Sequence, residues 1–238
     1  MNPCETTRPH DTRPVLGLRP VIVLLGGPGS GKGTHGQTLA NVLGYQHLSS
    51  GEHLRDHIRR ATPLGLRAQH SIETGQLVPD EMAVELVREM LGSSLEARGF
   101  VLDGYPRTLA QAEALQVLAP ELEIIVAKTV FLQVSDDEIV RRLSGRLTCR
   151  DCGATCHETF KPPAISGLCD SCGGALLRRA DDEPATIRNR IALFHEKTAP
   201  VVDFYRTNRT LIEVAAEGPA NEVGTRVVAA VGGLSDRL

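Results

Sequence analysis

Residues 26–34 combine the residue types from which a phosphate-binding loop is built. They read GGPGSGKGT, so Lys32 is followed by Gly33, and a hydroxyl comes one place later at Thr34. Glycines lack the Cβ atoms that would keep backbone amides away from a phosphate, and they allow the positive φ angles of a curled loop. Lys32 adds a mobile positive charge. A turn this rich in glycine would weaken the fold unless it bound something, so the pattern predicts an anion site.

A second group of reactive side chains lies between residues 149 and 172, where five of the six cysteines occur. The quartet Cys149, Cys152, Cys169 and Cys172 has the spacing Cys-x2-Cys, sixteen residues, Cys-x2-Cys. This spacing is typical of a tetrahedral zinc site made of four thiolates. Apolar residues are scarce here, so the metal would supply much of the local folding free energy. Cys156 and His157 are spare candidates, and we interpret both as bystanders because four cysteines already complete the coordination.

Asp103 and several arginines are further candidates for phosphate chemistry. Asp103 ends the apolar run Phe-Val-Leu-Asp at 100–103. An acid at the carboxyl end of a parallel strand would lie beside the phosphate loop, where it could orient a water molecule on Mg²⁺. The alternative is a carboxylate that only caps the next turn. Arg142 and Arg146 follow a predicted helix start at Ser135, and on their own they could equally belong to a solvated basic face.

The segments around these motifs alternate between apolar runs and apolar residues at helical spacing. Strands are predicted near 21–25, 45–48, 100–103, 129–134 and 210–214, and helices near 38–43, 54–58, 82–91, 135–146, 187–201 and 221–231. Ser50 is the expected N-cap of the second helix. Such alternation indicates an α/β fold with a parallel sheet covered on both faces. Strand, glycine-rich turn and helix is also the context that a phosphate loop requires.

Composition sets the limits of the interpretation. The chain has 238 residues, of which 41% are hydrophobic and 23% charged, which suits one core with insertions. The net charge of -3 gives no general electrostatic case for nucleic acid or an anionic membrane as the main partner. No apolar run approaches the ~20 residues of a membrane span, and polar residues and prolines stand at the beginning of the chain. We therefore expect a cytoplasmic protein with a flexible extension at 1–19.

Taken together, the loop, SGEHLR at 50–55, DGYPRT at 103–108 and the cysteine quartet closely resemble adenylate kinase, a nucleoside monophosphate kinase, in its long form with a zinc-bearing lid. The likeness runs in unbroken order from about residue 20 to 234. It implies a three-layer P-loop fold whose core comprises 20–48, 79–145 and 183–238. Two inserts would close over the substrates: a helical one at 49–78 over the monophosphate and a zinc-ribbon-like lid at 146–182 over ATP.

The resemblance also implies roles for individual residues. ATP would be bound by the loop residues and two arginines: Gly27, Pro28, Gly29, Ser30, Gly31, Lys32, Gly33, Thr34, Arg142 and Arg146. AMP would be bound by Ser50, Arg55, Val78, Gly104, Arg107, Gln111, Arg179 and Arg190. Catalysis would rest on Lys32, Asp103, Arg107, Arg142, Arg179 and Arg190, with Mg²⁺ arriving with ATP and held through water by Asp103. Zinc would occupy the cysteine quartet as a structural ion.

The implied activity is reversible phosphoryl transfer from Mg-ATP to AMP, giving two ADP, by a monomer without nucleic acid or membrane partners. Such a reaction needs positioning and charge stabilisation more than covalent help, and planar arginine forks suit phosphate oxygens. Ser50, Glu52 and His35 stand where threonine, aspartate and glutamine are usual in the family. The Ser-Gly-Glu form resembles UMP/CMP kinases, which are the alternative, while Gln111 could pair with a donor and an acceptor on adenine and favours AMP.

A non-enzymatic alternative is a zinc-ribbon module that binds nucleic acid and keeps a vestigial nucleotide site. The segment between the cysteines offers few basic or stacking residues for this role, chiefly Arg150, Phe160 and Lys161. Kinase turnover without salt-dependent nucleic-acid affinity would exclude this alternative.

Overall fold

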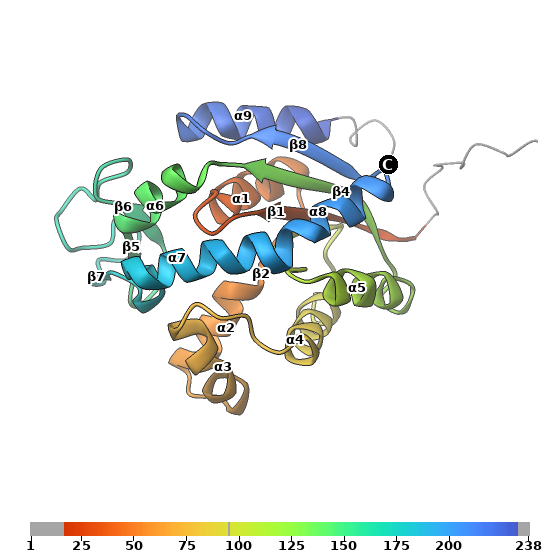
Figure 1. The fold of residues 1–238 in the computed structure, drawn as a ribbon, viewed down its shortest axis with the longest axis horizontal. Helices are drawn as coiled ribbons and strands as arrows, with labels where there is room; N and C mark the ends of the chain where they lie inside the picture. Colours follow the sequence, from red (N-terminus) through yellow and green to blue (C-terminus); the bar gives the residue numbers. More distant parts are fainter. Residues whose placement is uncertain (1–16, 95, 233–238) are drawn as a thin grey trace, which may run out of the picture.

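Five parallel strands form the centre of the computed structural model, which describes residues 17–94 and 96–232 (Figure 1). In chain order the strands are β1 (Arg19–Gly26), β2 (Gln46–Ser49), β3 (Phe100–Asp103), β4 (Ile124–Gln133) and β8 (Leu211–Ala215). Their order across the sheet is β2-β3-β1-β4-β8. β1 therefore occupies the middle, hydrogen-bonded to β3 on one side and to β4 on the other.

Alternate side chains of β1 explain why its whole sequence is apolar. Val21, Val23 and Leu25 belong to one core cluster, and Ile22 and Leu24 to another on the opposite face of the sheet. A parallel strand buried on both faces has no polar side to show, which matches the unbroken run of the sequence. The parallel sheet with two covered faces confirms the predicted α/β fold class.

Helices pack on both faces of this sheet. α1 (Lys32–Leu43) and α9 (Ala220–Val231) cover one face, while α4 (Asp80–Gly92), α5 (Leu109–Glu121) and α8 (Ala199–Thr207) cover the other. α6 (Asp136–Ser144) and α7 (Pro184–Leu193) form a smaller cluster through Ile139, Leu143, Ile187 and Ile191. The α7 to α8 helix runs across the front of Figure 1.

The long helix expected at 187–201 is interrupted. A π-helical segment at Phe194–Thr198 joins α7 to α8. Such a segment adds a residue to the turn and shifts the faces of the two flanking helices relative to each other. Helical spacing in the sequence therefore predicted the helix but not its change of register.

Two short helices, α2 (Ser50–Arg59) and α3 (Pro63–Glu73), lie between β2 and α4. The N-cap of α2 is Ser49, whose hydroxyl accepts a hydrogen bond from the Glu52 amide, so the expectation that Ser50 caps this helix is wrong by one residue. Thr62 caps α3 in the same way, with Pro63 in the first turn where a missing amide hydrogen costs nothing.

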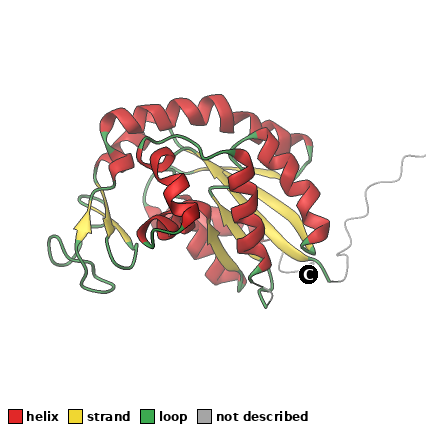
Figure 2. Ribbon diagram, turned by 90° about the horizontal axis from the view of Figure 1, so that it is seen from below, coloured by secondary structure: helices red, strands yellow, loops and turns green. Residues whose placement is uncertain are grey.

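A separate three-stranded antiparallel sheet carries the cysteine segment. It consists of β5 (Arg146–Cys149), β6 (Thr155–His157) and β7 (Leu176–Leu177) in the order β6-β5-β7, followed by the 3-10 turn Ala180–Asp182. Figure 2 shows this small sheet beyond one end of the main sheet, with long loops around it.

All five predicted core strands are present, although β4 begins at Ile124, earlier than expected, and α5 was not anticipated. The extension expected at 1–19 falls mostly on residues 1–16, which lie outside the described residues, and Arg19 is already the first residue of β1. Within the described residues, no helix has the length and apolar character that crossing a membrane would require.

Candidate active site

The glycine-rich stretch forms the connection between β1 and α1, as its sequence predicted. Gly26, Gly29 and Gly31 have φ angles of 150°, 73° and 93°, in the region that other residues rarely adopt. A Cβ on Gly26 would lie 2.6 Å from Ser30 Oγ and 2.9 Å from the Leu132 carbonyl oxygen. The curl of the loop therefore depends on glycine at these places, and it leaves the N-terminus of α1 open to an anion.

The side chain of Lys32 folds back onto the loop that precedes it. Its ammonium donates hydrogen bonds to the carbonyl oxygens of Gly26 and Gly27, both at 2.8 Å. Burial lowers the pKa of Lys32 to about 8, with Asp103 opposing the fall and nearby arginines adding to it. Phosphate oxygens would be better partners for the charge than two loop carbonyls, so the side chain is placed to turn toward a ligand.

A cavity of about 1350 Å³ opens in front of the loop. It is bounded by the loop, the start of α2, the end of β3, the first strands of the cysteine-bearing sheet and the turn before α9. Its cationic lining includes seven of the predicted site residues: Lys32, Arg55, Arg107, Arg142, Arg146, Arg179 and Arg190. Residues far apart in the sequence thus meet around one space large enough for two nucleotides.

The arginines stay charged although they are largely removed from water. Burial lowers the pKa of Arg107 to about 10, with Arg190 adding to the effect, and burial lowers that of Arg179 to about 9, with Arg146 adding to it. Both values remain above neutral pH. Burial also lowers the pKa of Arg55 and of Arg190. The cavity is therefore a concentrated positive region, which favours a polyanionic ligand.

Two acids that the sequence analysis did not assign to the site hold these arginines in place. Arg146 binds Asp182 through two parallel hydrogen bonds of 2.7 and 2.6 Å, and Arg190 donates to the same carboxylate at 3.0 Å. Arg190 also lies 3.0 Å from a carboxylate oxygen of Asp181. Burial would raise the pKa of Asp181, yet it is lowered because four arginines surround the group, Arg190 foremost. No local motif marks such a role, because Asp182 meets Arg146 only after the chain folds back.

Asp103 lies at the carboxyl end of β3, directly opposite the loop. Its carboxylate is 3.4 Å from Ser49 Oγ and would lie 3.6 Å from a Cβ at Gly33. The buried Nε2 of His47 has no hydrogen-bond partner among the described groups and is 3.9 Å from the same carboxylate. Carboxylate and hydroxyl oxygens are the ligands that Mg²⁺ prefers, so Asp103 and the exposed Thr34 fit an ion that arrives with a nucleotide.

A smaller pocket of about 30 Å³ adjoins the large cavity and shares Gly104 and Arg107 with it. Ser50, Val78 and Gln111 line this pocket and not the large cavity. Gln111 is buried, with its Oε1 accepting from the Arg107 amide at 2.8 Å and its Nε2 donating to Asp80 at 2.7 Å. Each of the two atoms keeps one further hydrogen-bonding position, so the amide can still pair with a donor and an acceptor.

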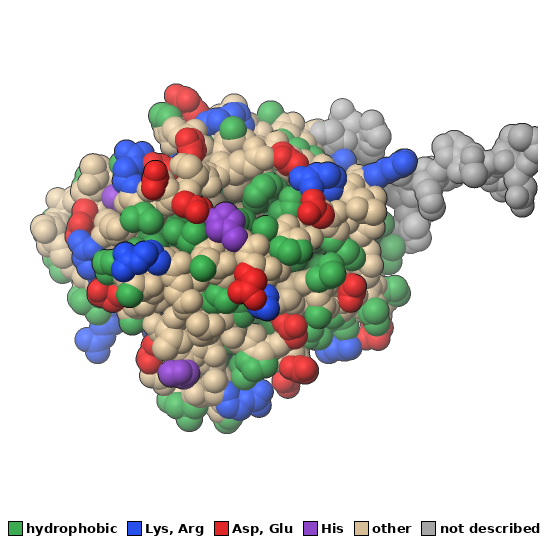
Figure 3. All heavy atoms as spheres, in the orientation of Figure 1, with side chains coloured by type: hydrophobic (Ala, Val, Ile, Leu, Met, Phe, Trp, Pro, Cys, Tyr) green, Lys and Arg blue, Asp and Glu red, His purple; other side chains and the backbone are tan. Residues whose placement is uncertain are grey.

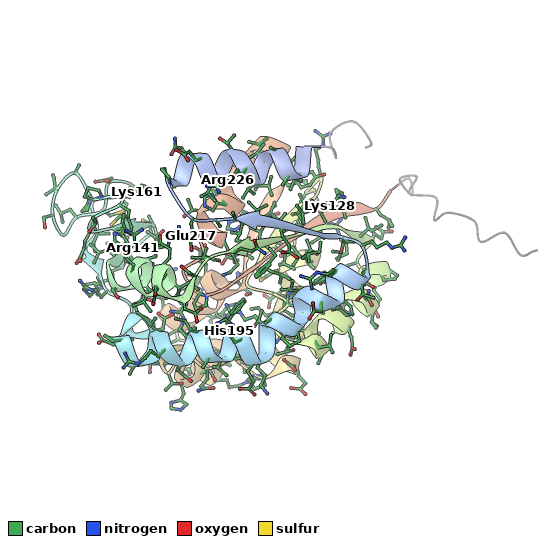
Figure 4. All side chains as sticks on the ribbon, turned by 45° about the horizontal axis from the view of Figure 1, so that its top comes forward. Lys128, Arg141, Lys161, His195, Glu217 and Arg226 are labelled. Carbon is green, nitrogen blue, oxygen red and sulfur yellow. The ribbon has the colours of Figure 1, made fainter. Side chains whose placement is uncertain are left out.

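Arg142 is tied down at the opposite side of the cavity. It donates to Glu138 at 2.7 Å and to the carbonyl oxygen of Ala216 at 2.9 Å. Glu217 and Arg226 are labelled in Figure 4, and Arg226 donates to the Glu217 carbonyl oxygen at 2.7 Å. Arg141, also labelled there, lines the cavity too and has its guanidinium 4.7 Å from the centre of the Phe160 ring. The basic face of α6 is therefore only partly solvated.

The cysteine quartet has the donor set and spacing of a metal centre. The four Sγ atoms all lie within 4.8 Å of one another. The Sγ atoms of Cys149 and Cys172 are 3.5 Å apart, and those of Cys152 and Cys169 are 3.7 Å apart. Zinc–sulfur bonds of 2.3 Å in a tetrahedron place the sulfurs about 3.8 Å apart. Cys156 and His157 are not part of this cluster, as the sequence analysis interpreted them.

The two Cys-x2-Cys turns are built alike. Gly153 and Gly173 follow their cysteine pairs, and each has a φ of 75°. The backbone amide of Cys152 leads in lowering the pKa of Cys149 to about 7, and the amide of Ser171 acts in the same sense on Cys169, whose pKa is also lowered. Amides aimed at the sulfurs of Cys149 and Cys169 therefore favour thiolates there, whereas at Cys172 the Gly174 amide is outweighed by the thiols of Cys152 and Cys149, which raise its pKa to about 12. The fit to zinc rests on the four sulfur donors and their spacing.

The structure thus gathers the predicted side chains in one region, with two differences of detail. Ser30 is fully buried, and neither it nor Gly27 lines the cavity, so both support the loop from beneath. His47, Ser49, Asp181 and Asp182 join the region without having been predicted. A phosphate loop at the carboxyl edge of a parallel sheet, facing a cavity crowded with arginines, defines the class of P-loop kinases that act on nucleotides.

Comparison with known proteins narrows this class. The family model described as adenylate kinase matches residues 24–210. An adenylate kinase of Acidothermus cellulolyticus is 42% identical over 210 residues, which cover 88% of this chain and 97% of that protein. One from Geobacillus is 41% identical over 213 residues, covering 90% and 99%, and one from Methanocella arvoryzae is 40% identical over 210 residues, covering 88% and 97%. The chain belongs to the adenylate kinase family, and phosphoryl transfer between ATP and AMP is the activity of this family.

Proposed function

We propose that the chain transfers the terminal phosphoryl group of Mg-ATP to AMP and that the cavity residues divide this work between two nucleotide sites. A phosphate oxygen of AMP forms the new bond to the γ-phosphorus, and the bond from that phosphorus to the β-phosphate oxygen breaks, so that two ADP are produced. The observation that carries the proposal is one cavity joining the phosphate loop to the pocket of Ser50, Val78 and Gln111 through a group of arginines.

The ATP side would comprise the loop and the arginines next to it. Amides from Gly29 to Thr34 would surround the β- and γ-phosphates, and Lys32 would exchange its two loop carbonyls for phosphate oxygens. Arg142 would lie against the adenine, where Glu138 and the Ala216 carbonyl hold it, and Arg146 would line the same side. Mg²⁺ bound with ATP would neutralise phosphate charge, with Asp103 and Thr34 as the residues near it.

The AMP side would comprise the small pocket and the arginines between the sites. Ser50 and Gln111 would hydrogen-bond the base, with Val78 over it and Gly104 beneath. Arg55 and Arg107 would hold the α-phosphate of AMP, and Arg179 and Arg190 would contact the phosphoryl group that is transferred. Since the charges are placed before the substrates arrive, catalysis would come from positioning and electrostatic stabilisation, which the chemistry requires.

The segments 49–78 and 146–182 would act as the closing inserts, because both contribute walls to the cavity and, apart from Ser49 at the end of β2, neither belongs to the main sheet. Closure would exclude water, which would otherwise accept the phosphoryl group. Zinc in the cysteine quartet would stabilise the second insert and take no part in chemistry, because four thiolates leave no open coordination position. A single chain holds every assigned residue, so we propose a monomeric enzyme.

Charged side chains of both signs are interspersed on the face of the molecule seen in Figure 3, whereas the cavity lining is mainly cationic. A small polyanion inside the cavity therefore suits this protein better than an extended one along this face.

A coupled assay with ATP and each of AMP, CMP, UMP and GMP tests the proposal. We expect AMP to have the highest kcat/KM, and a preference for CMP or UMP would overturn the base assignment. Arg55→Ala should raise the KM for AMP about 10- to 100-fold, the value of a charged hydrogen bond to phosphate. Arg60→Ala is the matched control, because Arg60 directly follows the same helix as its C-cap, but its side chain is 67% exposed and paired with Asp56.

A further inference from the structure

Three metal-ligating side chains meet away from the cavity, where α2 faces α4. His53 and His57 come from α2, Glu89 comes from α4, and one ligand atom of each lies within 4.8 Å of the others. The two histidines are four residues apart and therefore share one face of their helix. Their ring centroids are 5.0 Å apart at an interplanar angle of 62°, so the rings are close without being stacked face to face.

Contacts within the described part of the fold leave ligand atoms of these three side chains available. Among the described residues, the carboxylate of Glu89 has no ion-pair partner, and the His53 ring makes no hydrogen bond. His57 is held from one side, because its Nδ1 lies 2.8 Å from Thr62 Oγ1. This contact leaves Nε2 of His57 as the nitrogen available to a ligand, and it provides the outer oxygen partner that metal-binding histidines usually have.

We propose that His53, His57 and Glu89 form a second metal site, which takes a divalent transition-metal ion of the zinc class. Two imidazoles at i and i+4 with one carboxylate are a donor set that suits Zn²⁺ and its neighbours, whereas Mg²⁺ and Ca²⁺ prefer oxygen ligands alone. The described residues offer three protein ligands at this place, so water would complete the coordination. The ion is consequently exchangeable, unlike one enclosed by the four cysteines.

The ligand atoms of the three side chains lie close to the spacing of an occupied metal site, and side-chain rotation can bring them closer. Metal–ligand bonds of about 2.0–2.2 Å place ligand atoms about 3.3–3.6 Å apart in a tetrahedron, which is less than the 4.8 Å limit within which these atoms lie. Glu89 is exposed and its side chain is long, so rotation of this one residue brings its carboxylate nearer the rings.

An ion at this site would join α2 to α4, between which the described residues show no side-chain hydrogen bond or ion pair. α2 begins with Ser50 and carries Arg55, to which the proposed function gives contacts with AMP, while α4 packs in the core against the main sheet. Metal binding therefore braces α2 against the core. This consequence for the enzyme rests on the proposed function, whereas the binding itself does not.

Zinc titration of the untagged full-length protein, followed by calorimetry without nucleotide, tests the site. The wild-type chain should bind one equivalent tightly and a second more weakly. His53→Ala, His57→Ala and Glu89→Gln should each weaken only the second event, by about tenfold or more, since even an outer partner of a metal is worth that much. His70→Ala is the matched control, because His70 is exposed on the neighbouring helix α3 and is not part of the cluster.

Hydrogen exchange provides the second readout. The second zinc equivalent should slow amide exchange in both α2 and α4, and Glu89→Gln should remove the effect on α4. A wild-type protein that binds only one equivalent, or a second event that survives in all three variants, would overturn the proposal. Because nucleotide is absent, a failed zinc titration leaves phosphoryl transfer untouched, and a failed kinase assay leaves the zinc titration valid.

Discussion

Asp182→Asn removes the charge that holds two cavity arginines while keeping the size of the side chain. In the wild-type protein, Arg146 and Arg190 share this buried carboxylate through three hydrogen bonds of 2.7, 2.6 and 3.0 Å. Asparagine retains one acceptor oxygen and presents an NH₂ group to the guanidiniums. At least one strong hydrogen bond is therefore lost, and two cations are left near each other without their common partner.

The size of the effect follows from how much water reaches the two arginines. Removing one partner of a buried ion pair costs about 3–5 kcal/mol. The side chains of Arg146 and Arg190 are 19% and 18% exposed, so water takes over part of the lost interaction and the lower value, about 3 kcal/mol, applies. For a chain of this length, about 3 kcal/mol corresponds to a fall in Tm of about 6–12 °C.

Thermal melts with and without an ATP–AMP bisubstrate dinucleotide measure this prediction. Phosphates in the cavity would replace the missing carboxylate, so the ligand should raise the Tm of Asp182→Asn by more than it raises that of the wild type. Asp56→Asn is the matched control, since Asp56 also accepts from two arginines, Arg59 and Arg60, but on the surface. Its Tm should stay close to that of the wild type. Our reasoning is refuted if Asp182→Asn melts no lower than this control.

Three further predictions concern the loop, the metal and the pH profile. Lys32→Ala should lower kcat about 10²–10³-fold in the coupled assay, with a melting temperature near that of the wild type, because a charge that acts on the transition state is removed; a loss below tenfold would contradict its role. Cys149→Ser should abolish stoichiometric zinc in elemental analysis and lower the Tm, while kcat at low temperature falls less than in Lys32→Ala. The kcat/KM for ATP should fall as pH rises through about 8, where free Lys32 loses its proton, and a flat profile from pH 7 to 9.5 would oppose this. Between about 8 and its ordinary value of 10.5, the unfolded chain binds more protons at this residue than the folded one, so the contribution of Lys32 to stability rises with pH.

Features that depend on a short stretch of sequence could be predicted, because their geometry is local. The phosphate loop, the two Cys-x2-Cys turns and the apolar strands each specify their own conformation within a few residues. Errors arose where a single position decides the outcome. Ser49 and Ser50 are identical side chains in adjacent positions, and only the hydrogen bond to the Glu52 amide shows which one caps the helix.

Long-range partners were the part that the sequence could not reveal. Asp182 follows Arg146 by thirty-six residues in the sequence. The two side chains meet because the cysteine-bearing sheet begins at Arg146 and its last strand brings the chain back beside this residue. His47 is near Asp103 because β2 and β3 are neighbours in the sheet, where Ser49 is paired with Asp103. These two contacts depend on the topology of the fold, which the spacing of residues along the chain does not reveal.

Net charge likewise does not reveal the charge of the cavity. The chain as a whole carries -3, yet among the described residues the lining of the cavity holds nine lysines and arginines and only four acids. Like charges gathered at partial burial destabilise the empty protein, and the shared carboxylates of Asp181 and Asp182 offset only part of this cost. Under the proposed function, substrate phosphates would offset the remaining repulsion, and this relief would contribute to the affinity for nucleotides. In the empty protein, Asp181 and Asp182 are therefore the groups that offset the repulsion among the cavity arginines. A substitution at Asp182 tests this balance directly, whereas replacing an arginine removes one of the repelling charges as well.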